Sequence, residues 1–387
     1  MNVCRAAQTA VAAALLAATC IALASAQSPP SVSALRKEQV PAKQSTLPEN
    51  QYTVGIVTGE PQSTDFTIAY DIATTLAKGQ ETGPHGEMAL RVMAMVGTGG
   101  TRNISDVLTL PGADMAIVPV IVLNRLRATK EIGDLGSKLV YVTLLFPEEI
   151  HVLARAEIQD IADLAGQAVN FGQEGGAAEV FGREILGRLG IKVREVNVDL
   201  NAAVDGMRTG QISATLLVSG KPVKSLASYS KGNGLHFVAI PYSPALYQDY
   251  LPTALKHEDY PELIGVDENI ETIAAGSALM AYNWPPRSER FRLLELFART
   301  LFSRIDEFKT EPHHPKWREL NLAAALPGWR RFPPAERWLA QHAPAEAELR
   351  RQFERFLSQG GITNSVGNDR ERIFQDFLRW LKRSNEH

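Results

Sequence analysis

From Tyr52 onward the sequence repeats one pattern: a short apolar stretch, a loop of small or polar residues, and a segment with apolar residues at helical spacing. The first unit has an apolar stretch over 52–57, a polar loop over 58–64 and an expected helix over 65–78. Apolar residues three and four positions apart predict the helix, and short apolar runs between turn residues predict buried strands. Strands that alternate with helices at this spacing predict parallel β-sheets with helices on both faces.

The same pattern occurs twice, before and after about residue 147, and therefore predicts two α/β lobes with a cleft between them. A chain of 387 residues is long enough for two compact domains. We assign residues 51–147 plus about 283–345 to lobe 1 and residues 148–282 to lobe 2. Expected strands cover 89–96, 113–120, 139–145, 150–155, 168–171, 193–198 and 212–218, and expected helices cover 102–110, 161–166, 177–189 and 201–209.

The first 26 residues have the layout of a secretory signal peptide. Arg5 is followed by an apolar run over 10–24 and by the small residues Ala24-Ser25-Ala26. The alternative is an uncleaved anchor, but the run is shorter than the roughly 20 residues that span a membrane. We therefore expect a cleaved signal peptide over 1–26, a periplasmic protein, and a flexible leader over 27–50, which is rich in Ser, Pro, Gln and Lys.

Both cysteines, Cys4 and Cys20, lie in the expected signal peptide, so the mature chain would have no disulfide and no thiolate metal site. The formal net charge of -3 gives no indication of a nucleic-acid surface. A dinucleotide fingerprint would need glycine where Arg102 stands, and the common hydrolase motifs are absent. His313 and His314 are adjacent, and neighbouring residues rarely face one metal. We therefore expect a binding protein without metal or cofactor, and not an enzyme.

Three loops of small residues, over 58–64, 97–101 and 172–176, each follow a strand and precede a helix. Small side chains let a ligand approach the backbone, and the first turn of a helix offers unpaired N–H groups that favour anions. In open α/β sheets, ligands bind beyond the carboxyl ends of the strands. The alternative is that these turns only connect strand to helix. The expected ligand-binding residues are Gly59, Ser63, Thr64, Thr98, Gly99, Gly100, Thr101, Asn103, Glu148, Glu174, Gly175, Gly176 and Lys221.

Several short segments, in order and spacing, resemble the TAXI family of solute receptors, which serve one class of TRAP transporters. The resemblance extends from about Tyr52 to about Trp338 and rests on residues 96–104 with 112–118, 145–155, 169–172 with Gly187, Gly190 and Ile191, 210–214 and 219–222. It implies a type II periplasmic-binding-protein fold whose two lobes close on a ligand around crossing strands. It also implies acidic amino acids or other small carboxylates as ligands, and a separate membrane permease as partner.

The sequence departs from this family in two candidate loops. The first loop carries Glu60, and the third carries Glu174 where the family presents hydroxyl groups. Two glutamates would repel a dicarboxylate unless Arg102 or Lys221 offsets them, so we expect a ligand with an amine or a neutral polar ligand. The alternative is that both glutamates point to solvent. Adjacent strand residues face opposite sides, so at most one of Glu148 and Glu149 faces the cleft.

The last segment, residues 346–387, has apolar residues at helical spacing and is expected to form a helical C-terminal extension. It would pack on a lobe or dock a permease or a second copy, and the oligomeric state stays open. Three functions remain under comparison: a TRAP receptor, a binding subunit for an ABC importer or a sensor kinase, and an enzyme built on the same two lobes.

Overall fold

The computed structural model describes residues 52–61, 63–78, 90–226, 229–230, 232 and 234–342. The expected signal peptide, leader and C-terminal extension lie outside these residues. The described strands are β1 Thr53–Val57, β2 Arg91–Met95, β3 Ala113–Pro119, β4 Leu139–Arg155, β5 Ala168–Asn170, β6 Arg194–Val196, β7 Ala214–Ser219, β8 Leu235–Phe237, β9 Leu251–Lys256 and β10 Asn269–Tyr282. The helices are α1 Thr64–Ala77, α2 Gly100–Thr109, α3 Val120–Thr129, α4 Ala177–Arg188, α5 Leu200–Arg208, α6 Glu289–Ser303 and α7 Pro333–His342, with short 3-10 turns η3 Ile161–Leu164, η4 Lys224–Leu226, η6 Ile305–Lys309 and η7 Pro315–Glu319.

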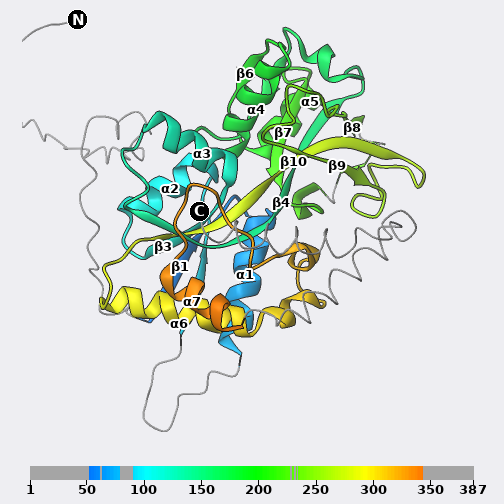
Figure 1. Ribbon diagram of the computed structural model, residues 1–387. Coiled ribbons are helices and arrows are strands. Elements are labelled where there is room, and N and C mark those ends of the chain that lie inside the picture. Colours follow the sequence, from blue (N-terminus) through cyan, green and yellow to red (C-terminus); the bar gives the residue numbers. More distant parts are fainter. Residues whose placement is uncertain are drawn as a thin grey trace, which may run out of the picture.

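The strands form one continuous sheet in the order β2-β1-β3-β10-β4-β7-β5-β6, with β8 beside β4 and β9 beside β10. The long antiparallel strands β4 and β10 run through the middle of the molecule and join its two halves (Figure 1). One half contains the parallel set β2-β1-β3, and the other contains the parallel set β7-β5-β6. The fold is therefore two α/β lobes connected by crossing strands, as the sequence predicts.

The prediction of parallel sheets holds for the outer strands of each lobe but not for the centre, because β4 and β10 pair antiparallel with each other and with their neighbours β7 and β3. The two strands expected over 139–145 and 150–155 are a single strand, β4. Pro147 does not end it, because Pro147 lies opposite Gly276 where the β4–β10 register shifts. A bulge is one of the few places in a sheet that tolerate a residue without an N–H group.

Helices cover both faces of the sheet, and the period of two along each strand supplies apolar side chains to both. In β3, Ala116 and Val118 pack with α2, α3 and α4, whereas Met115 and Ile117 pack with α1, α6 and α7. Figure 1 shows α6 and α7 beside α1, far from them in sequence. A third core lies under α5 and η4. The lobe boundaries stay a prediction, because the connecting strands belong to both halves.

Two buried ion pairs fix later segments of the chain to the sheet. Asp114, at the start of β3, pairs with Arg290 of α6 and accepts a hydrogen bond from the backbone N–H of Gly55 (3.1 Å). Glu149 of β4 pairs with Lys316 of η7 (Oε1–Nζ 2.7 Å). None of the helices in the described ranges is both long and apolar enough to cross a membrane.

Candidate functional site

A cleft of about 650 Å³ lies between the two lobes. Its walls come from the loops that follow β1, β2 and β5, from the first turns of α1, α4 and α5, and from β4 and β7. Six of the residues expected from the sequence line it: Gly59, Ser63, Thr98, Gly99, Glu148 and Gly176. Thr98 also places a buried hydroxyl group on this wall that has no hydrogen-bond partner among the described residues.

The other expected residues lie around the cleft without lining it. Four of them, Thr64, Gly100, Thr101 and Asn103, are buried in the first turns of α1 and α2, and Gly175 is buried in the loop before α4. Glu174 is exposed to solvent, which is the alternative that the sequence left open for it. Lys221 turns away, because its Nζ pairs with Asp259 (3.0 Å) and donates to the carbonyl of Ala254 (2.5 Å).

The two lobes touch on two sides of the cleft. On one side, Thr64 of α1 donates its backbone N–H to Ser219 Oγ (3.1 Å) and its hydroxyl to the carbonyl of Gly220. On the other side, the backbone N–H of Arg102 donates to the carbonyl of Gly175 (3.2 Å). Hydrogen bonds between the first turns of α1 and α2 and segments of the other lobe therefore join the two lobes beside the cleft.

The loop between β2 and α2 has a shape that glycine permits. Gly99 and Gly100 have φ values of 79° and 59°, in the left-handed region that other residues rarely adopt. A Cβ atom on Gly100 would lie 2.5 Å from the backbone carbon of Gly176. Asn103 fixes the loop, since its Oδ1 accepts from the N–H of Gly99 (3.0 Å) and its Nδ2 donates to the carbonyl of Ile117 (3.2 Å).

A pair of buried carboxyl groups meets at the cleft. Glu148 of β4 is 1% exposed, Asp65 of α1 is 8% exposed, and both line the cleft. In the described part of the chain, no donor reaches either carboxylate oxygen of Glu148 or Oδ1 of Asp65. Within the described residues, the two carboxyl groups can satisfy each other through a hydrogen bond that requires a shared proton.

Burial raises the pKa of both carboxyl groups, because removal from water disfavours the charged form. The pKa of Asp65 rises to about 6, against a hydrogen bond with Glu148 that acts in the opposite direction. The pKa of Glu148 rises well above its ordinary value through burial and then through the adjacent charge of Asp65. The pair therefore holds a proton more tightly than an isolated carboxyl group does.

Neighbouring residue Glu149 points away from the cleft, as strand alternation predicts. Its carboxylate accepts from Lys316 and from the backbone N–H of Lys221 (2.9 Å). His151 on the same strand is fully buried, with Nδ1 near the carbonyl of Glu149 (3.0 Å) and Nε2 near the Tyr260 hydroxyl (2.7 Å). Burial lowers the pKa of His151 to about 3, and both ring nitrogens have hydrogen-bond partners in the core.

The charge of the cleft is one-sided. Glu60 and Asp199 line it together with Asp65 and Glu148, and no lysine or arginine appears among its described lining residues. Burial, followed by repulsion from Asp199, raises the pKa of Glu60. Neither Arg102 nor Lys221, the two cations that the sequence offers to offset the acidic loops, lines the cleft.

Sequence reasoning missed several lining residues, including Asp65, Asn170, Asp199, Thr215, Ser219 and Tyr229. Asp199 could have been found from the sequence, because an Asp just before an expected helix is a typical N-cap. In the structure it caps α5 by accepting a hydrogen bond from the N–H of Ala202 (2.9 Å). Asp65 carried a weaker signal, because an acid in the first turn of a helix usually only complements the helix dipole. Its proximity to Glu148 depends on the tertiary structure, which brings the first turn of α1 and the middle of β4 to the same cleft.

The ligand-free protein with Glu148→Gln is expected to melt a few degrees higher than the wild type at pH 8. The raised pKa of Glu148 means that the folded state holds this proton more tightly than the unfolded chain. The stabilising contribution is therefore present at low pH and lost as pH rises above the ordinary glutamate value. Melting curves at pH 5 and pH 8 should show that the rise in melting temperature over the wild type is smaller at pH 5. Exposed Glu174→Gln is the control, and an equal gain at both pH values would contradict this expectation.

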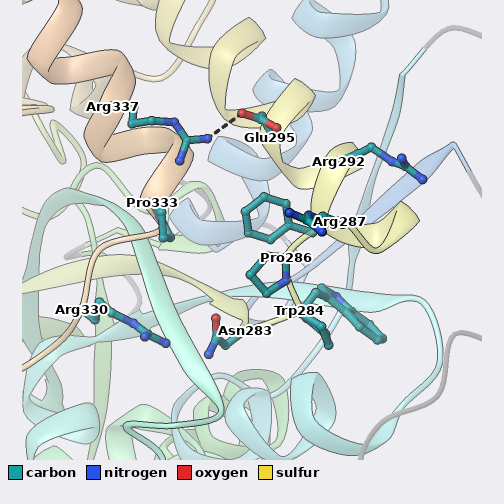
Figure 2. A pocket seen from close by; sticks show the side chains of 11 residues that line it. Asn283, Trp284, Pro286, Arg287, Arg292, Glu295, Arg330, Pro333 and Arg337 are labelled. Carbon is teal, nitrogen blue, oxygen red and sulfur yellow. Dashed lines mark hydrogen bonds and ion pairs between the residues drawn. The ribbon is translucent and has the colours of Figure 1, made fainter.

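A second pocket of about 490 Å³ lies between α6, α7 and the segment after β10. Figure 2 shows Arg287, Arg292, Arg330 and Arg337 around it, with Arg337 paired to Glu295 (2.8 Å). It shares no lining residue with the interlobe cleft and has the opposite charge. It is therefore a surface separate from the cleft. Its arginines offer positive charge to an anion added in a binding experiment.

The crossing strands and the interlobe cleft define a two-lobed α/β protein with a central cleft. The chain belongs to the NMT1-like family, whose model matches residues 56–329. No curated protein matches the sequence.

Several solved structures are similar at low identity. The periplasmic binding protein BugD has 12% identity and a TM-score of 0.42, over 80% of this chain and 97% of that one. A protein described as a periplasmic transporter has 16% identity and a TM-score of 0.40, over 66% and 85%. The periplasmic aliphatic sulphonate binding protein SsuA from Escherichia coli has 14% identity and a TM-score of 0.37, over 80% and 88%.

Proposed function

We propose that the protein is a periplasmic solute receptor that captures an amino-acid-like ligand or another small carboxylate and delivers it to a separate TRAP-type membrane permease. The observation that carries this proposal is the interlobe cleft, beside which direct hydrogen bonds join the two lobes. A site formed by two lobes can release its ligand when the lobes separate. The segments that resemble the TAXI family support a TRAP permease as the partner.

The polar groups of the cleft fit a small ligand with more than one functional group. α4 begins at Gly176 without a side-chain cap, and Ala177 and Ala178 of its first turn line the cleft. Such a helix start favours a carboxylate. The buried hydroxyl of Thr98 adds a hydrogen-bonding group on the same wall. The acidic pair provides a place for an ammonium group.

A thermal-shift screen of the chain from residue 27 tests this function, after co-purified ligand has been removed by unfolding and refolding. The panel contains amino acids, dicarboxylates, 2-oxoacids and polyamines. A ligand that binds only the folded state raises the free energy of unfolding, by about 2.7 kcal/mol at one hundred times its Kd. The melting temperature rises with it. We expect a concentration-dependent rise with one class of ligand. No rise with any class would contradict a receptor for these solutes.

A further inference from the structure

We propose that the ligand carries a net positive charge, and that its ammonium or guanidinium group binds between the carboxyl groups of Asp65 and Glu148. This inference rests on the proposed solute-receptor function and specifies the ligand class of the same cleft. Among the carboxylate and amine ligands that the proposed function allows, it selects those with a net positive charge.

The position of the two carboxyl groups is the first support. Glu148 is on the crossing strand β4, and Asp65 is in the first turn of α1, so the pair forms where the lobe packs against the connecting strands. Both side chains are more than nine-tenths buried and line the cleft. Their unpartnered oxygens therefore lie within the wall of the cleft, next to the space that a ligand would fill.

The cost of leaving these oxygens unpaired is the second support. Native proteins pair nearly all buried polar side-chain atoms, and an unpaired buried carboxylate is especially unfavourable. A shared proton relieves this cost only in part, because it serves one contact between two groups that together offer four oxygens. An ammonium group has three donors and a guanidinium group has five, so either one satisfies more of these oxygens and supplies the missing charge.

The surrounding charges are the third support. Glu149 is next to the pair, but Lys316 and the backbone N–H of Lys221 already bind its carboxylate on the other side of β4. Glu60 and Asp199 face the cleft and add to its negative potential. A zwitterion with one amine and one carboxylate would leave this excess uncompensated, whereas a ligand with an additional cationic group compensates it.

The remaining walls favour an organic cation over a metal ion. Within the described ranges, no group of three or more His, Cys, Asp and Glu side chains is placed to hold a metal. Phe171, Leu200, Leu216 and Val218 give the cleft an apolar surface on which an aliphatic stem can pack. The chemistry of the cleft therefore fits an amine or guanidinium group on a short aliphatic chain.

A matched set of five-carbon probes tests the charge directly by calorimetry at pH 7.5. Cadaverine carries two ammonium groups, 5-aminopentanoate carries one ammonium and one carboxylate, and glutarate carries two carboxylates. L-lysine and L-glutamate repeat the comparison on an amino-acid frame. We expect cadaverine or L-lysine to bind at least tenfold more tightly than glutarate and L-glutamate. The same calorimetry measures whether Mg²⁺ and Ca²⁺ bind.

Variants then locate the binding. Glu148→Gln and Asp65→Asn should each weaken binding of the cationic probe at least tenfold, while Glu174→Gln, on the exposed part of the third loop, should change it less than twofold. Both site variants keep the shape of the side chain, and their melting temperatures show whether they fold. Arg330→Gln identifies any anion that binds in the arginine-lined pocket instead of the cleft.

The pH dependence gives an independent readout. A bound cation replaces a proton held by the pair, so binding should release a proton and become tighter as pH rises. Calorimetry in two buffers with different ionisation heats measures that proton. In both site variants the proton release should fall.

The outcomes separate the two proposals. Tight binding of glutarate, L-glutamate or 5-aminopentanoate in the cleft without tight binding of a cation overturns the inference and leaves the receptor function in place. Binding of a cation that both site variants retain, or binding of metal ions alone, also overturns it. If none of the probes binds, whatever its charge, the result contradicts the receptor function itself.

Discussion

Gly100→Ala is expected to weaken ligand binding at least about tenfold, which corresponds to about 1.4 kcal/mol. The added Cβ atom would lie 2.5 Å from the backbone carbon of Gly176 and 2.6 Å from the backbone nitrogen of Ala177. These atoms belong to the opposite lobe and cannot move aside as a flexible side chain would. The clash arises only when the lobes meet, so the substitution should disfavour the closed cleft.

Gly112→Ala is the matched control for backbone strain. Gly112 has φ 80°, also in the left-handed region, but a Cβ atom there meets nothing within 4 Å. Both variants should lose a similar amount of stability from strain, about 1–2 kcal/mol. Calorimetry with a ligand found in the screen, together with melting curves, separates the two effects. Equal affinities for the two variants would show that closure does not depend on the Gly100 contact.

Lys316→Met is expected to destabilise the protein by about 3–5 kcal/mol, because it leaves the carboxylate of Glu149 buried without its cation. The side chains of Lys316 and Glu149 are 1% and 2% exposed, and the Nζ–Oε1 distance is 2.7 Å. Methionine replaces the aliphatic stem, so the loss of packing is small. The pair also fixes η7 against β4, on the side opposite to the cleft carboxylate Glu148.

Denaturant unfolding at pH 5 and pH 8 measures this loss. Burial already raises the pKa of Glu149, and without Lys316 its folded form would hold a proton still more tightly. Stability that depends on this proton is present at low pH and lost as pH rises, so the defect should be larger at pH 8. Lys309→Met is the control, since its exposed pair with Asp306 should contribute at most about 1 kcal/mol. A loss no larger than that of the control would contradict a structural role for the buried pair.

The sequence predicted much of the local structure correctly. Its apolar spacing indicated helices close to α1 Thr64–Ala77, α4 Ala177–Arg188 and α5 Leu200–Arg208, and strands close to β1, β3 and β7. These elements can be predicted from the sequence because the helical and strand periods depend on residues near one another in the chain. The candidate loops were also found locally, since small residues between a strand and a helix mark them without any knowledge of packing.

The sequence did not determine how the elements pair. A proline and two glutamates suggested a break at 147–149, but β4 continues through them because β10 accommodates the shift opposite Pro147. Antiparallel pairing of β4 and β10 depends on a partner strand from a distant part of the chain. The direction of the central strands therefore became clear only in the tertiary structure.

The candidate site divides in the same way. The sequence by itself determined which loops carry small residues, and that Glu148 and Glu149 face opposite sides of a strand, because both properties are local. Only the tertiary structure decided that Asp65 meets Glu148, that Lys221 turns toward Asp259, and that Glu174 faces solvent. The charge of a cleft is a sum over residues that folding brings together from several elements, and no local pattern contains that sum.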